Sequence, residues 1–191
     1  MNFALFLETV KLRCKPFEPA DQLDHAKIGM ITELGELGDL IKRAFVYGKP
    51  FDPVNLMEEV GDYLWYFVLF CDVRGVRMAT LDAEYELRMR FLRGAHRADE
   101  KQALLALACL TARLCEQGLH SLHSDGETRD AVVGLLTMLL QKHSFTLSQC
   151  LETNDKKLEA RTGKMFSAGD ILARDTAAER VILEAGAKGS G

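Results

Sequence analysis

Hydrophobic side chains recur at helical spacing along most of this chain. Between about residues 22 and 47 they fall on one stripe, which consists of Leu23, Ala26, Ile28, Ile31, Leu34, Leu37, Leu40 and Ile41. The stripe predicts a long amphipathic helix with Asp21 as its N-cap, and a Gly-Lys-Pro segment ends it. Asp52 as a cap and Pro53 at the first helical position predict a second helix that continues to about Val73.

The rest of the chain repeats this helical pattern in shorter segments. We expect helices over residues 1–13, 79–92, 101–117, 129–143, 147–161 and 177–183. A polar turn is expected at residues 120–126, and the Gly-rich residues 185–191 are expected to form a disordered tail. No segment alternates as a strand does. The predicted fold class is therefore all-α, a helical bundle in a single domain of residues 1–184.

The spacing of leucines suggests an internal repeat. A shift of 73 residues aligns Ile31, Leu34, Leu37 and Ile41 with Leu104, Leu107, Leu110 and Leu114. The hairpin of residues 22–75 then has a degenerate counterpart in residues 101–161, in which the set of acidic residues is not kept. Two amphipathic hairpins that bury their stripes against each other form a four-helix core. The alternative is coincidence, because Leu-rich helices align easily with one another.

Two pairs of acidic residues interrupt the apolar pattern. Glu33 and Glu36 lie on the first long helix, and Glu59 and Asp62 lie on the second. Each pair has i,i+3 spacing, so its two carboxylates project from one face of a helix. For each acid taken alone, a solvated position on an amphipathic helix is the simpler interpretation. The two pairs together indicate a shared site.

Asp62 is the acid that most needs an explanation, because it is the only charged residue between Val60 and Cys71. An ionised carboxylate buried among apolar groups costs several kcal/mol unless a cation compensates it. No basic residue is near in sequence, since Lys42 and Arg43 lie at the far end of the preceding helix. Four facing carboxylates form an oxygen-rich site for which Mg²⁺ is the expected ion and Mn²⁺ an alternative.

Composition narrows the functional class. The 191 residues are 48% hydrophobic and 27% charged, as in ordinary globular proteins. A net charge of −4 argues against non-specific nucleic-acid binding, and no apolar run reaches the ~20 residues of a membrane span. The five cysteines form no Cys-x-x-Cys pair, which indicates reduced thiols. We expect a cytoplasmic protein with neither nucleic-acid nor membrane partners.

The acidic residues and their flanks resemble the MazG-like family of all-α nucleoside triphosphate pyrophosphohydrolases, particularly its small phage-type members. The shared pattern is Glu33-x-x-Glu36, a spacer and Glu59-x-x-Asp62, with matching flanks at His25, Tyr47-Gly48, Asp52 and Leu64-Trp65-Tyr66. A second similar segment is Asn154-x-x-Lys157-Leu158-x-x-Arg161, followed by Phe166 and Arg174-Asp175.

The resemblance covers about residues 22–73 and 147–175. Residues from about 78 to 146 have no counterpart in the simplest members of the family. The segment Gly163-Lys-Met also departs from the usual Tyr-Pro, which leaves the position of that segment open.

The resemblance implies Mg²⁺-dependent hydrolysis of a nucleoside or deoxynucleoside triphosphate to a monophosphate and pyrophosphate, in nucleotide-pool control or house-cleaning. The implied catalytic metal ligands are Glu33, Glu36, Glu59 and Asp62. Glu58 is implied either to orient the attacking water or to be a spare surface acid.

The resemblance also implies substrate contacts. Lys157 and Arg161 would stabilise charge on phosphate oxygens, and Asn154 would bind sugar or phosphate. Trp65, with the adjacent tyrosine, either flanks the base or belongs to the core. Lys42 either meets a phosphate or is part of a cationic last turn.

Two other functions remain open at this point. One is a non-catalytic helical adaptor or nucleotide-binding protein that kept the fold. The other is the same chemistry on an alarmone nucleotide. The base, the sugar and the number of metal ions are open too, and either a monomer or a homodimer is compatible with the sequence.

Overall fold

The computed structural model describes residues 1–76, 78, 99–116, 122–162 and 176–188. Within these ranges the chain forms helices and no strand, so the all-α prediction is confirmed for them. The helices are α1 (Phe3–Arg13), α2 (Pro19–Phe45), α3 (Pro53–Val73), α5 (Glu100–Glu116), α6 (Leu122–Lys142), α7 (Leu147–Thr162) and α8 (Thr176–Lys188). The helix expected over 79–92 and the expected Phe166 and Arg174 segment lie outside the described residues.

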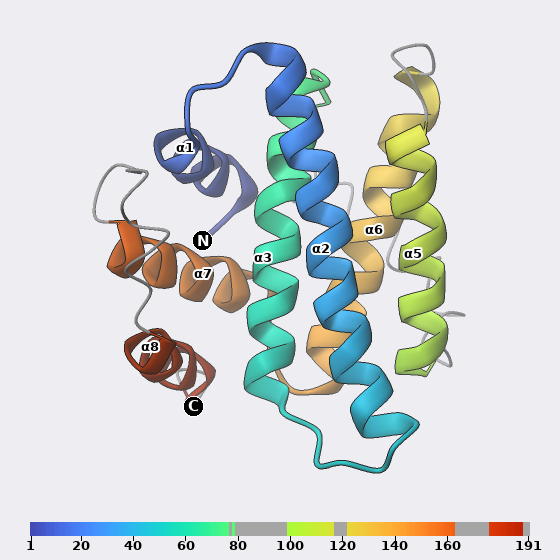
Figure 1. Ribbon diagram of the computed structural model, residues 1–191, viewed down its shortest axis with the longest axis vertical. Helices are drawn as coiled ribbons and strands as arrows, with labels where there is room; N and C mark the ends of the chain where they lie inside the picture. The colour runs from blue at the N-terminus through green and yellow to red at the C-terminus, as the bar shows by residue number, and fades with distance from the viewer. Residues whose placement is uncertain (77, 79–98, 117–121, 163–175, 189–191) are drawn as a thin grey trace.

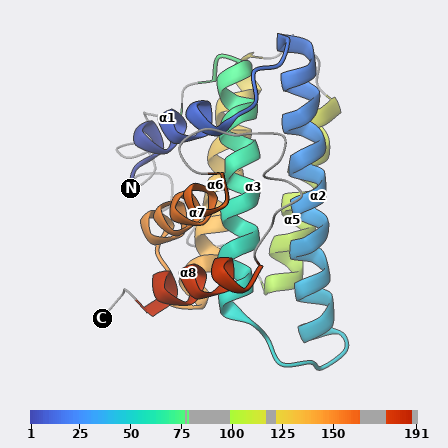
Figure 2. The ribbon, with the colours of Figure 1, turned by 60° about the vertical axis from the view of Figure 1, so that its left-hand side comes forward.

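Two helical hairpins stand side by side in the structure (Figure 1). Helices α2 and α3 form the first hairpin and α5 and α6 the second, with α5 against α2 and α6 against α3. The second hairpin ends at Lys142, whereas the predicted counterpart of residues 101–161 also included α7, which packs on α3 rather than on the second hairpin. A common origin of the two hairpins remains a prediction. Helices α1, α7 and α8 cover another side of α3 (Figure 2).

Helix α3 is the central element because it packs against its hairpin partner α2, against α6 of the second hairpin, and against α1, α7 and α8. Asp52 caps it as predicted: its Oδ1 accepts hydrogen bonds from the N–H groups of Val54 (3.0 Å) and Asn55 (3.1 Å). Pro53 stands at its first position, also as predicted. None of the described helices is both long enough and apolar enough to span a membrane.

Three predicted boundaries are wrong. Helix α2 begins at Pro19 with Glu18 at the N-cap, because proline presets the first helical φ, and Asp21 therefore lies in its first turn. Helix α6 begins at Leu122, inside the segment expected to be a polar turn. Helix α8 continues to Lys188, so residues 185–188 are helical and are not part of a disordered tail.

The end of α8 is held by close packing on α7. A Cβ on Gly186 would lie 2.2 Å from Oγ1 of Thr153, so only glycine permits this approach. In addition, Nε2 of Gln149 donates a hydrogen bond to the carbonyl of Gly186 at 2.5 Å. These contacts explain why the helix continues through a Gly-rich stretch.

The buried face of α2 is also different from the predicted stripe. Ile28 and Ile31 are 62% and 53% exposed, whereas Gly29 and Met30 are buried. The reason is the ring of Tyr66 on α3, which lies so close to Gly29 that an added Cβ would be 2.1 Å from Cδ1 of the ring. At this level helix α2 therefore turns Gly29, and not Ile28 or Ile31, toward α3.

This contact gives a testable prediction. Gly29→Ala should destabilise the protein by about 1–3 kcal/mol, the usual cost of overpacking a tight contact. Gly35→Ala on the same helix is the matched control, because its Cβ would meet nothing within 4 Å. That control should be neutral or stabilising by up to about 1 kcal/mol, since alanine is the better helix former. Urea denaturation of both variants measures the difference, and equal midpoints would contradict the contact.

Candidate metal centre

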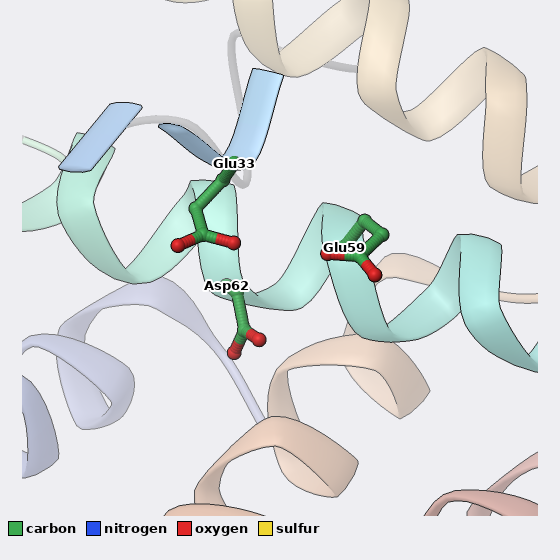
Figure 3. Close-up of side chains that lie close together, drawn as sticks. All are labelled: Glu33, Glu59 and Asp62. Atoms are coloured by element: carbon green, nitrogen blue, oxygen red, sulfur yellow. The ribbon is translucent and has the colours of Figure 1, made fainter. Parts of the chain in front are cut away.

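Three carboxylates converge between α2 and α3 (Figure 3). Glu33 comes from α2, and Glu59 and Asp62 come from α3. Each offers an oxygen atom, and these atoms all lie within 4.8 Å of one another. The convergence follows from the register of the antiparallel hairpin. Gly29 faces Tyr66, so one turn further along α2 and one turn back along α3 bring Glu33 opposite Asp62.

Glu36 is not a member of this three-carboxylate group. Its side chain is exposed, about one turn beyond Glu33 on α2. Its charge contributes to the raised pKa of Glu33, which places it within electrostatic reach of the group. A role for Glu36 as a metal ligand therefore remains a prediction.

Asp62 has a cationic partner within the chain, contrary to the sequence-based expectation. Nζ of Lys157 on α7 lies 2.6 Å from Oδ1 of Asp62, and Nδ2 of Asn154 donates to the same oxygen at 2.6 Å. The Lys157 side chain is 0% exposed and that of Asp62 is 19% exposed. The compensating charge was missed because it comes from 95 residues further along the chain.

Lys157 also reaches a second acid, since its Nζ lies 3.4 Å from Oε1 of Glu58. Lys157 therefore bridges Asp62 and Glu58 and holds the two carboxylates relative to α7. Gly61 leaves the space for α7 to approach, because a Cβ there would lie 3.0 Å from Cβ and Nδ2 of Asn154. Oδ1 of Asn154 is buried without a hydrogen-bond partner.

One lysine does not neutralise the whole group. The pKa of Glu33 is raised to about 7, by burial first and then by the charge of Asp62. The pKa of Glu59 is raised to about 8, again by burial first and then by Asp62. Both carboxyls therefore retain protons near neutral pH where ordinary glutamates are ionised. A divalent cation with oxygen ligands relieves this repulsion, so the donor set fits Mg²⁺ or Mn²⁺.

The raised pKa values predict a pH dependence of stability. Between the ordinary glutamate value of 4.5 and about 8, the folded protein binds more protons at Glu59 than the unfolded chain does. The free energy of unfolding therefore falls as pH rises through this window. Measured in EDTA by urea denaturation, wild type should lose stability relative to Glu59→Gln between pH 5 and pH 8. A constant difference between the two proteins would contradict the shift.

Arg161 lies on α7 one turn beyond Lys157. Its Nε and Nη2 bind Oε1 and Oε2 of Glu179 on α8, at 2.7 and 2.8 Å. This bidentate pair raises the pKa of Arg161, and the charges of Asp62 and Glu58 raise it further. Arg161 is therefore close to the carboxylates but held by another helix.

An aromatic cluster borders the carboxylates on the side of Gly29. The ring of His25 lies edge-on to Trp65 (6.1 Å) and to Tyr66 (5.4 Å). Nδ1 of His25 and Nε1 of Trp65 are buried without a hydrogen-bond partner. The pKa of Tyr66 is raised to about 12, by burial first and then by Glu33 and Asp62. The Tyr66 hydroxyl therefore stays protonated near the acids.

Lys42 lies about 14 Å further along the axis of α2 than Glu33, at the helical rise of 1.5 Å per residue. Its side chain is exposed and pairs with Asp39 at 2.7 Å. This location favours its interpretation as part of a cationic last turn.

Comparison of the chain with protein-family models, with curated proteins and with solved structures gives no match. The resemblance to the MazG-like family therefore depends on the motif residues, and membership remains a prediction. The geometry described above is independent of that resemblance.

Proposed function

We propose that this protein is a Mg²⁺-dependent nucleoside triphosphate pyrophosphohydrolase. The observation that carries the proposal is the convergence of Glu33, Glu59 and Asp62, whose oxygens lie within 4.8 Å of one another on two antiparallel helices. Such a group is costly without a cation, and Mg²⁺ in proteins is usually held by one or two carboxylates together with the phosphates of a substrate. A role in nucleotide-pool control or house-cleaning would follow from this activity.

The carboxylates and their neighbours have distinct roles in this proposal. Glu33, Glu59 and Asp62 hold Mg²⁺, with Mn²⁺ as an alternative ion. When bound, the ion supplies positive charge to neutralise a triphosphate and Lewis acidity to activate water. Lys157 and Asn154 orient Asp62, since both contact its Oδ1 at 2.6 Å.

The proposed reaction is hydrolysis of the α–β phosphoanhydride. A water oxygen forms a bond to phosphorus, the bridging P–O bond breaks, and a monophosphate, pyrophosphate and a proton are released. In this proposal Arg161 donates from α7 to phosphate oxygens. Glu58, which forms an ion pair with Lys157, orients the attacking water. The adjacent rings of Trp65 and Tyr66 border the nucleoside.

A substrate panel tests the proposal. Wild-type protein is incubated with Mg²⁺ and each deoxynucleoside triphosphate, ribonucleoside triphosphate or guanosine tetraphosphate alarmone, and the products are separated by chromatography. We expect at least one nucleotide to yield its monophosphate and pyrophosphate in equal amounts. Calorimetry with a non-hydrolysable triphosphate separates turnover from binding. If nucleotides bind but none is cleaved, the protein is a nucleotide-binding regulator and not an enzyme.

A further inference from the structure

Helix α8 reaches the candidate site through the ion pair between Glu179 and Arg161. Glu179 on α8 holds Arg161 side-on through Nε and Nη2, and the two side chains are 5% and 23% exposed. A bidentate guanidinium–carboxylate pair fixes both the position and the plane of the guanidinium. Glu179 belongs to none of the motif segments that carry the resemblance.

Helix α8 is itself fixed where it presents Glu179. The next residue, Arg180, binds both carboxylate oxygens of Asp52, at 2.9 and 3.2 Å. Asp52 caps α3, the helix that carries Glu59 and Asp62. Helix α8 therefore links the start of α3 to the end of α7, and the position of Glu179 is fixed relative to both helices.

The acids of the candidate site also act on Arg161, because the charges of Asp62 and Glu58 contribute to its raised pKa. Asn154, Lys157 and Arg161 follow one another at i, i+3 and i+7, so they share one face of α7. The first two contact Asp62 directly. An arginine one turn further on is long enough to fold onto the same acids, which carry more negative charge than Lys157 neutralises.

We propose that Glu179 is a positioning residue that holds Arg161 away from the carboxylate group and so keeps this group open to a divalent cation. Released, the guanidinium competes with the metal as an internal cation. Held, it leaves Nη1 outside the pair and available to a phosphate oxygen. The inference rests on the metal site of the proposed function, but it concerns cation binding and needs no turnover.

A double-mutant cycle on Mn²⁺ binding tests this role. Mn²⁺ affinity is measured by calorimetry, with the free ion followed by electron paramagnetic resonance, for wild type, Glu179→Gln, Arg161→Met and the double variant. Glu179→Gln should weaken binding about tenfold, the size expected for one competing charged hydrogen-bonded contact. In the Arg161→Met background the same change should have no further effect, because the competitor is gone.

Two further variants make the result specific. Glu184→Gln removes a more exposed carboxylate from the same helix and should leave Mn²⁺ affinity close to that of wild type. Glu179→Asp keeps the charge but shortens the side chain, so it should give a smaller loss, and it replaces Glu179→Gln in the cycle if that variant does not fold.

The outcomes separate the two proposals. An unchanged Mn²⁺ affinity in Glu179→Gln, or a loss that persists in the double variant, overturns the role of Glu179, because a purely structural pair lowers stability without this coupling. Wild type that binds Mn²⁺ but cleaves no nucleotide overturns the proposed function and leaves the cycle intact. Wild type that binds no Mn²⁺ overturns both.

Discussion

Replacing Lys157 with methionine should destabilise the metal-free protein by about 3 kcal/mol. The Nζ of Lys157 contacts Asp62 and Glu58, and its removal leaves Asp62 beside Glu33 and Glu59 without the ammonium group that lies against both of its oxygens. Breaking a buried ion pair by removing one partner typically costs about 3–5 kcal/mol, and the lower end applies because Asp62 is partly exposed. At about 2–4 °C for each kcal/mol, the Tm should fall by roughly 10 °C.

Mg²⁺ should restore more stability to Lys157→Met than to wild type, because the variant's carboxylates have lost the buried ammonium group that contacts Asp62 and Glu58. Lys156→Met is the matched control: this neighbouring lysine is exposed and pairs with Glu152 on the same helix. An exposed pair of this kind contributes about 0.3–0.5 kcal/mol, so the control should be nearly neutral. Equal stability of the two variants, measured by urea denaturation in EDTA, would show that Lys157 is not the internal cation.

Glu59→Gln should have opposite effects on stability and on activity. The glutamine keeps the size of the side chain but removes a carboxylate whose pKa is raised by burial and by Asp62. At pH 8 in EDTA the variant should therefore be more stable than wild type, because less charge repulsion remains in the group. In Mg²⁺ it should hydrolyse the best nucleotide about 10³-fold more slowly, the scale of loss when one element of electrostatic stabilisation is removed.

Higher stability together with lower activity in Glu59→Gln would distinguish a metal ligand from a residue whose role is purely structural. A variant that loses activity by misfolding loses stability as well, whereas Glu59→Gln should gain stability and lose the increase in Tm that Mg²⁺ gives wild type. Glu152→Gln, which removes an exposed carboxylate from α7, should change neither quantity. If Glu59→Gln keeps full activity, this residue does not hold the catalytic ion.

Local signals in the sequence predicted much of the framework. The cap at Asp52, the following Pro53 and the uninterrupted apolar run fixed α3 within the chain, because each acts over one or two turns. The i,i+3 spacing of the acids predicted correctly that Glu59 and Asp62 share a face. It did not separate Glu33, which joins the group, from the exposed Glu36, because the rotation of α2 is set by a tertiary contact.

That contact is the packing of Tyr66 on Gly29. Counting hydrophobic residues assigned Ile28 and Ile31 to the core, since a hydrophobicity pattern gives no weight to a glycine that admits a ring. The cationic partner of Asp62 could not be predicted from the sequence, for a different reason. Lys157 lies 95 residues from Asp62, and no local rule pairs charges at that separation.

Glu179 carried no signal at all in the sequence. It is one of many acids in charged helices, and its pairing with Arg161 depends on how α8 returns to α7. Long-range electrostatic contacts of this kind are set by the packing of whole helices. They become visible only when the helices are placed relative to one another.

We propose that the carboxylates of Glu33, Glu59 and Asp62 bind one divalent cation between α2 and α3. Crystals grown with Mn²⁺ at pH 8 test it most directly, because manganese gives an anomalous diffraction signal that locates the ion without reference to any assumed site. We expect an anomalous peak in contact with oxygens of all three side chains. A peak elsewhere with none at this position, or a site occupied by the guanidinium of Arg161 in wild-type protein, would contradict it.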